Sequence, residues 1–419
     1  MLSVLRQRDF ALLWTAGLIS WTGHWMLFIA LPVTVYELTG SPAATAGILI
    51  ANSIPSLVLG SVAGVFVDRW DRRRTMVVVN LVRAPILLLL LTVDSADRLW
   101  IVYVVAFATS ALSQFFGPAE NALLPRLVGD EYLVPANAVN ALNNNLARLI
   151  GPALGGLVAA WAGLRGVAAV DAVSFFIAAA LIAAIATSAK PERRREPDVH
   201  AVKALWTEWL DGLRLIRANR VLGVVFGVLA LTSLGEGVMG AIFWVWVDEA
   251  LDGGALEAGW LMSAQAVGGL LGAFVIGAWA KGVSPARLLG WGAIGLGAID
   301  LVIFNYPAFL SGIWLGLLLM AIVGVPATAS GTGFTTLIQT ETDDAYRGRV
   351  FGALNTTTAL LVIAGAALAG AVTGRLGATT VLTVQSASSV VAGLFALRML
   401  GVWAVPRLRA KRASVPEGD

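Results

Sequence analysis

Ionisable side chains inside otherwise apolar stretches are the groups of this chain that could do chemistry. Glu236 lies in the run LTSLGEGVMG, about half-way through such a stretch, with no Lys or Arg within one helical turn. A charged group at the centre of a bilayer is costly and usually functional, and desolvation favours its neutral form. Glu236 is therefore predicted to load and release protons. The alternative is a protonated or hydrogen-bonded glutamate that serves only packing.

A second candidate is an aromatic stripe around a histidine. His24 shares one helical face with Trp21 and Phe28. An imidazole titrates close to physiological pH, and aromatic faces receive apolar or cationic compounds. This stripe is predicted to face a substrate. In the alternative, Trp21 and Trp25 anchor against lipid and His24 bonds a carbonyl, and the sequence leaves both open.

Four further polar residues lie within apolar stretches. Gln114 and Gln265 could touch a ligand, although a glutamine within a membrane often only joins helices. Asp171 and Asp300 are expected nearer the outer surface, where water reaches them.

Two arginines within apolar stretches are interpreted as structural. Arg83 and Arg148 are each expected to bond a carboxylate or helix carbonyls, because an unpaired cation is costly there. The stripe of Arg148 also carries Asn137, Asn140 and Asn144.

The composition is that of an integral membrane protein. The 419 residues are 58% hydrophobic and 13% charged, and the mean hydropathy is +0.80. Soluble domains carry about a quarter charged residues. There is no cysteine and there are two histidines, which excludes disulfides, thiol chemistry and a histidine-rich metal cluster. No metal and no cofactor are expected.

Twelve stretches are long enough to cross a bilayer, which takes about 20 apolar residues. They lie at roughly 10–36, 43–67, 75–93, 99–121, 137–161, 164–189, 221–247, 256–280, 286–304, 306–337, 350–374 and 378–405. With both termini cytoplasmic, most of the 29 Lys and Arg residues fall on the inner side, as the positive-inside rule requires. Only Arg98, Arg165 and Arg375 fall on the outer side.

The chain repeats itself at an offset of about 213 residues. Gly64, Asp68 and Arg74 lie over Gly277, Lys281 and Arg287. This predicts an all-α membrane protein with two pseudo-symmetric six-helix bundles. The expected domains are an N-terminal bundle (1–189), a cytoplasmic linker (190–220), a C-terminal bundle (221–405) and a cytoplasmic tail (406–419). In the linker, one helical stripe is apolar and predicts a helix at the inner membrane surface; it carries Val202, Leu205, Trp206, Trp209, Leu210, Leu213 and Ile216.

The loop after the second stretch reads GVFVDRWDRRR. Its spacing of Gly64, Asp68, Arg69, Arg72 and Arg73 resembles the signature loop of the major facilitator superfamily of secondary transporters. The fifth stretch holds ARLIGPALGG, whose residues Gly151, Pro152, Gly155 and Gly156 resemble the signature associated with antiporters in that superfamily. With the runs FFGPAENALLPRLVGDEYLVPANAVNAL and DDAYRGRVFGALN, the whole chain looks like the drug-and-siderophore exporter branch.

The resemblance implies roles for several residues. Asp68 would engage the start of helix 11 near Val350, and Asn143 and Asn355 would be pseudo-symmetric partners at a gate formed by the fifth and eleventh spans. Helices 1, 4, 7 and 10 would line the substrate cavity. Three positions depart from the pattern of relatives: Ala147 replaces a glycine, His24 an acidic residue and Glu120 an arginine.

Other classes of protein fit less well. No lysine stands in a nucleotide-binding Gly-rich loop, and no selectivity-filter motif suggests a channel. Neither a Gly-x-Ser-x-Gly elbow nor an HExxH motif supports an enzyme. The runner-up is a lipid or lysophospholipid flippase of the same fold.

The sequence thus predicts a proton-coupled exporter of small amphipathic or hydrophobic compounds in a bacterial cytoplasmic membrane. It would be a monomer working by alternating access, with a small-molecule substrate, protons and the lipid bilayer as partners and no nucleic acid. Drug, macrolide, siderophore and lipid all remain open as substrates.

Overall fold

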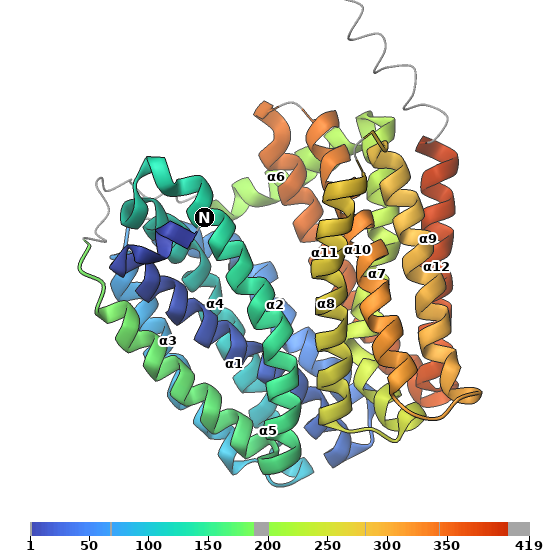
Figure 1. The fold of residues 1–419 in the computed structure, drawn as a ribbon, viewed down its shortest axis with the longest axis horizontal. Coiled ribbons are helices and arrows are strands. Elements are labelled where there is room, and N and C mark those ends of the chain that lie inside the picture. Colours follow the sequence, from blue (N-terminus) through green and yellow to red (C-terminus); the bar gives the residue numbers. More distant parts are fainter. Residues whose placement is uncertain (1, 68, 188–200, 281, 343, 401–419) are drawn as a thin grey trace, which may run out of the picture. The chain divides into compact units, whose positions relative to one another are not determined.

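The computed structural model describes residues 2–67, 69–187, 201–280, 282–342 and 344–400. Over these residues the chain is helical, without a strand, as predicted. The α-helices (Figure 1) are α1 (Arg8–Thr39), α2 (Pro42–Val67), α3 (Arg72–Leu88), α4 (Leu99–Val128), α5 (Leu133–Ala183), α6 (Ala201–Ala218), α7 (Arg220–Leu251), α8 (Ala255–Trp279), α9 (Pro285–Asn305), α10 (Trp314–Glu341), α11 (Asp344–Leu376) and α12 (Ala378–Leu400). Short 3-10 turns are η1 (Leu2–Arg6), η2 (Leu89–Thr92), η3 (Ala96–Arg98), η4 (Asp130–Tyr132) and η5 (Tyr306–Ala308).

Eleven helices of the described chain are long and apolar enough to cross a membrane, all except α6. Helix α5 has 51 residues, and a straight helix of that length would measure about 76 Å, more than twice the bilayer core. At Gly163 the backbone leaves the helical region with φ 61° and ψ −166°, a conformation that glycine adopts without a Cβ clash. Gly163 therefore divides α5 into two spans at the predicted boundary, which gives twelve crossing segments.

A glycine and an aspartate set two of the helix ends. Gly40, with φ 57°, ends α1 and donates its N–H to the Tyr36 carbonyl at 2.7 Å. The Asp71 carboxylate accepts the Arg74 N–H at 2.9 Å and begins α3, which satisfies one of the free amides of that end.

One compact unit comprises Met1–Leu205, Gly240–Ala266 and Ala366–Ala378. Within it, α1 packs along α5, and α3 packs against both α4 and α5. Its main core is apolar and includes Leu87, Leu90, Val102, Val167 and Phe175, all almost fully buried. This core supports the face of α1 that carries the candidate site.

The other compact unit comprises Trp206–Met239, Val267–Gly365 and Thr379–Asp419. Helices α8 and α10 touch backbone to backbone in it, since a Cβ at Gly324 would overlap the main chain at Gly268. Such contacts between small residues replace the hydrophobic driving force that lipid does not supply. The division into two six-helix bundles stays a prediction.

Helix α6 is the amphipathic helix predicted in the linker. Ile216 is buried in the core of the second unit, and Trp209 and Leu213 pack against that core. On the opposite side Arg214 and Arg217 are exposed. The described part of the apolar stripe therefore packs on helices of its own unit.

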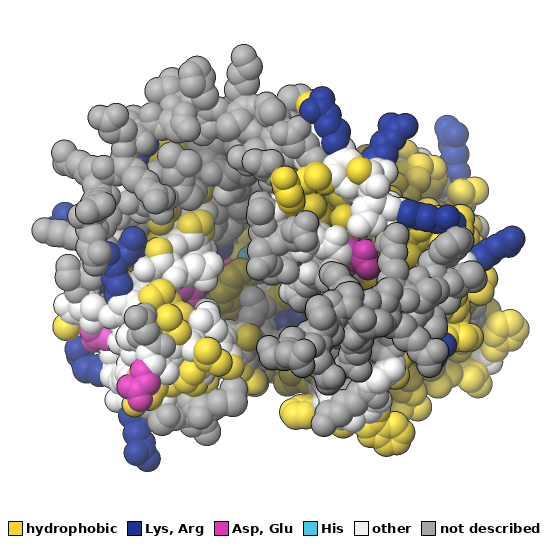
Figure 2. All heavy atoms as spheres, turned by 90° about the horizontal axis from the view of Figure 1, so that it is seen from above, with side chains coloured by type: hydrophobic (Ala, Val, Ile, Leu, Met, Phe, Trp, Pro, Cys, Tyr) yellow, Lys and Arg dark blue, Asp and Glu magenta, His cyan; other side chains and the backbone are white. Residues whose placement is uncertain are grey.

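Figure 2 shows Lys and Arg side chains projecting around the face of the molecule that it views.

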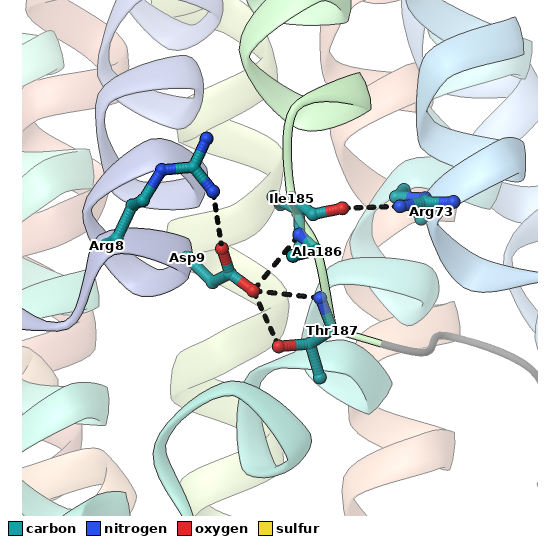
Figure 3. Close-up of polar contacts among 6 residues, drawn as sticks. All are labelled: Arg8, Asp9, Arg73, Ile185, Ala186 and Thr187. Carbon is teal, nitrogen blue, oxygen red and sulfur yellow. Dashed lines mark hydrogen bonds and ion pairs between the residues drawn. The ribbon is translucent and has the colours of Figure 1, made fainter.

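A polar clasp joins the start of α1 to the end of α5 (Figure 3). One carboxylate oxygen of Asp9 accepts the N–H of Ala186 at 3.1 Å, the N–H of Thr187 at 2.8 Å and the Thr187 hydroxyl at 2.6 Å. Beside it, the Arg73 guanidinium donates to the Ile185 carbonyl. The clasp ties the chain after the sixth span to the first and third spans.

We expect Asp9→Ala to lower the free energy of unfolding by about 1–3 kcal/mol, because three donors lose a charged acceptor. The readout is thermal unfolding of the purified protein in detergent. Arg8→Gln is the matched control, since Arg8 is 68% exposed and lies 3.6 Å from Asp9. An unchanged melting temperature for Asp9→Ala would show that the clasp does not hold the unit together.

Candidate functional site

A pocket of about 530 Å³, counted with the open space at its mouth, lies in the first unit. Its walls come from α1, α2, α4 and α7, and they consist of His24, Leu27, Phe28, Leu31, Pro32, Thr45, Ile48, Leu49, Asn52, Ala106, Thr109, Gly240 and Trp244. The lining is mainly apolar, with an imidazole, an amide and two hydroxyls. This is the usual make-up of a small-molecule site.

The predicted stripe of α1 contributes directly to this pocket. His24 and Phe28 line it, while Trp21 contacts the His24 ring edge-on at 5.6 Å between centroids. Trp25 packs edge-on against Phe28 at 5.1 Å. Trp21 and Trp25 thus pack against the two rings of α1 that line the pocket.

The family resemblance puts helix 7 at the cavity, and α7 does line the pocket, but sequence reasoning missed which of its residues do so. Trp244 lines the pocket and packs edge-on against Phe28 at 5.8 Å. Gly240, one turn earlier, also lines it, and a Cβ there would press on Leu49 of α2. The signal available in the sequence was the spacing Glu236, Gly240, Trp244, which repeats every four residues and marks one face of a helix.

Glu236 lies on α7 with an exposed side chain. The glycines on either side are in close contact: a Cβ at Gly235 would meet Gln385, and one at Gly237 would overlap the Val362 carbonyl. These contacts face α12 and α11, so they fix the rotation of α7 around Glu236.

Arg148 and Gln265 are brought together, although neither lines the pocket. A guanidinium nitrogen of Arg148 donates to the Gln265 amide oxygen at 3.3 Å, and the guanidinium lies 5.7 Å from the Trp25 ring centroid. The expected carboxylate or carbonyl partner of Arg148 is thus replaced by an amide and an indole. Gln114 instead bonds within its own helix, to the Ser110 carbonyl at 3.3 Å.

The glycines of the fifth-span motif let α5 approach two helices. A Cβ at Gly151 would meet Trp25, and one at Gly155 would lie 2.6 Å from the Met26 Cα, both on α1. On the other side, a Cβ at Gly156 would overlap the Ala255 carbonyl of α8.

The same motif is bonded to α8 at its proline. A Cβ at Gly259 would overlap the Pro152 carbonyl, and the N–H of Ala153 donates to the Ser263 hydroxyl at 3.1 Å. The motif therefore brings the backbone of α5 into close contact with both α1 and α8.

The two asparagines predicted as pseudo-symmetric partners have different surroundings. Asn143 is buried and donates to the Trp14 carbonyl at 2.6 Å. Glu120 is buried close by and bonds Asn140. Asn355, on α11, is exposed.

The signature loop is described only in part. Gly64 lies in α2 and Asp68 lies outside the described residues, so its predicted contact near Val350 is not described. Arg72 begins α3, and Arg73 belongs to the clasp described above. Arg69 lines a surface groove together with Trp70, whose ring stacks on Phe115 at 5.9 Å.

The expectation that Asp171 and Asp300 are wetted is wrong. Asp171 is fully buried, and Asp300 is 3% exposed. Both lie on helix faces that pack against other helices. The backbone of α1 at Gly23 contacts the Asp171 side chain. Gly297, three residues before Asp300, packs on α12. The sequence places such residues along a span but does not show which way the helix turns.

Comparison with known proteins identifies the family. The model of the family described as "Transmembrane secretion effector", of the major facilitator superfamily, matches residues 1–414. The chain belongs to this family. Its members are membrane transporters rather than enzymes.

Two relatives match over nearly their whole length. The multidrug efflux pump Tap of Mycolicibacterium fortuitum is 28% identical, over 94% of this chain and 95% of that protein. The enterobactin exporter EntS of Escherichia coli is 27% identical, over 99% of this chain and 96% of that one. These names agree with the exporter branch that the sequence resembles.

Solved structures agree on the fold. The nucleoside transporter NupG is 12% identical with a TM-score of 0.76, over 93% of this chain and 99% of that one. A bacterial homologue of the iron transporter ferroportin is 16% identical with a TM-score of 0.71, over 95% of this chain and 99% of that one. At this identity the likeness supports the major facilitator fold alone.

We expect Gly155→Ala to destabilise the protein and reduce transport, because a methyl group at Gly155 would collide with the backbone of α1 at Met26. Gly117→Ala in α4 is the matched control: nothing lies within 4 Å of its Cβ position, and alanine favours a helix by about 0.5–1 kcal/mol over glycine. Thermal unfolding in detergent would separate the two. Equal melting temperatures for the two variants would contradict the close approach of α5 and α1.

Proposed function

We propose that this transporter exports small amphipathic, aromatic-containing compounds in exchange for protons. The observation that carries the proposal is the mainly apolar pocket walled by His24, Phe28 and Trp244. Aromatic rings give a large contact area for such compounds with little loss of conformational entropy. The names of the relatives, a multidrug efflux pump and an enterobactin exporter, support outward transport of compounds of this kind.

Glu236 is the proposed proton carrier. It precedes Gly240 by one helical turn on α7, so it belongs to the stripe whose next two members line the pocket. Substrate and proton would then compete for neighbouring parts of one helix, which is what exchange by alternating access requires. His24, inside the pocket, is the proposed second contact for substrate.

The proposal also includes a location and an orientation in the membrane. The chain would lie in a bacterial cytoplasmic membrane as a monomer, with both termini inside. The basic loop residues Arg69, Arg72 and Arg73 support that orientation, because Lys and Arg near span ends are retained in the cytoplasm.

Flux into and out of proteoliposomes tests the coupling. We expect Glu236→Gln to abolish transport driven by an imposed pH gradient, because the amide cannot carry a proton, while substrate exchange without a gradient persists. The panel would contain ethidium, erythromycin and a catecholate siderophore. Glu131→Gln is the control, since Glu131 is exposed in the turn before α5.

Undiminished gradient-driven flux in Glu236→Gln would rule out this proton carrier. Flux of a fluorescent phospholipid without any gradient, in wild-type vesicles, would favour a flippase instead.

The aromatic wall gives a separate prediction. Trp244→Ala should raise the apparent KM for the transported aromatic compound roughly three- to tenfold, because an aromatic contact contributes about 0.5–1.5 kcal/mol beyond its buried area. Trp161→Ala is the control, as Trp161 is 94% exposed and outside the pocket. Initial rates over a range of concentrations measure both. An unchanged KM in Trp244→Ala would place the substrate elsewhere.

A further inference from the structure

A second group of ionisable residues lies behind the pocket, in the first unit. Asp171, on the half of α5 after Gly163, is fully buried, and Arg83 of α3 is 6% exposed. Asn80, one turn before Arg83 on α3, and Ser174, on the same helix as Asp171, are buried as well. Four polar side chains therefore lie in the interior, next to the apolar core cluster to which Phe175 belongs.

The hydrogen bonds of this group are incomplete. The Ser174 hydroxyl donates to the main-chain carbonyl of Asp171 at 2.7 Å and lies 2.9 Å from one of its carboxylate oxygens. Among the described residues, the second carboxylate oxygen has no hydrogen-bond partner, and neither do the buried Arg83 Nε and the two side-chain amide atoms of Asn80. The Arg83 guanidinium lies over the Phe175 ring, 4.3 Å from its centroid.

Arg83 and Asp171 act on each other electrostatically, yet they are not among the ion pairs within 4 Å found in the described chain. A buried ion pair offsets its desolvation only when the geometry is close and the remaining hydrogen bonds are made. This arrangement meets neither condition, so it is poorly suited to stabilising the fold. A working role explains its presence better.

The buried polar group of Asp171 and Arg83 contacts α1 at Gly23, the residue before His24 of the pocket wall. A Cβ at Gly23 would overlap the Asp171 carboxylate, so this carboxylate lies directly on the backbone of α1. The next residue, His24, lines the pocket, and the charge of Arg83 acts on it. The ionisable groups that act within the cluster are thus Arg83 from α3, His24 from α1 and Asp171 itself.

We propose that Asp171 is a second proton-binding site of this transporter, with Arg83 as its counter-charge. It deepens the proposed proton coupling and rests on it for its role in transport. With the carboxylate ionised, the charge of Arg83 is balanced. When Asp171 takes up a proton, that positive charge is left uncompensated beside His24, which disfavours a second positive charge at the pocket wall. Proton occupancy behind α1 is thereby transmitted to the substrate site without a change of fold.

Infrared difference spectra between two pH values test the site without any substrate. We expect the carbonyl band of protonated carboxyl groups to lose intensity in Asp171→Asn. In Glu236→Gln, the part of this band that comes from Asp171 should remain. Ser174→Ala, which removes a hydrogen bond and keeps the carboxyl, should retain the contribution. A spectrum of Asp171→Asn that matches the wild type would overturn the proposal.

Ethidium flux in proteoliposomes tests the role in transport. Asp171→Asn should lower the gradient-driven rate at least about tenfold while gradient-free exchange changes less than about twofold, since only coupling is removed. Equal losses in both modes would assign Asp171 to structure. If Asp171→Asn does not fold, Asp171→Asn combined with Arg83→Gln removes both buried charges and serves in its place.

The two proposals fail separately. A lost band in Asp171→Asn together with full gradient-driven flux in Glu236→Gln would overturn the role of Glu236 and leave Asp171 as the proton site. Loss of gradient-driven flux in Glu236→Gln with an unchanged spectrum in Asp171→Asn would overturn the role of Asp171 and leave Glu236 as the proton carrier.

Discussion

Close contact between the backbones of α1, α5 and α8 is the constraint on which the site depends. Lipid is as apolar as a leucine side chain, so helices in a membrane gain little from burying apolar surface against each other. They associate instead through dispersion contacts and hydrogen bonds at short range. In this protein the short range is made possible by Gly151, Gly155 and Gly156 of α5 and Gly259 of α8, each at a position where a methyl group would collide with the facing helix.

The close backbone contact between α1 and α5 determines the orientation of α1. The face of α1 at Trp25 and Met26 lies on the glycines of α5, and the backbone at Gly23 lies on Asp171. With those two faces taken, His24 and Phe28 are left to line the pocket. A single helix therefore lines the pocket with one face and contacts the buried Asp171 with another, which is the basis of the coupling proposed between them.

The buried polar groups of the first unit differ in how far their hydrogen bonds are made. Glu120 bonds Asn140 and Asn143 donates to a main-chain carbonyl, which offsets part of their desolvation, although the amide oxygen of Asn143 has no partner among the described residues. Arg83 and Asp171 keep unmade hydrogen bonds in the interior. Satisfied groups rigidify a bundle, whereas unsatisfied ones are costly and persist where their charge is used.

The sequence by itself determined the membrane class, the twelve spans and the family, since length, apolar runs, basic loops and short motifs are local properties of the chain. It also placed His24 and Phe28 on one stripe, because helical periodicity is local too. Tertiary structure alone decided that Trp244 completes the pocket, that Arg148 pairs with Gln265, and that Asp171 is buried rather than wetted. The reason is physical: a span of the right length and hydropathy can be rotated about its axis at no cost in local energy. Only contact with neighbouring helices selects which face turns inward.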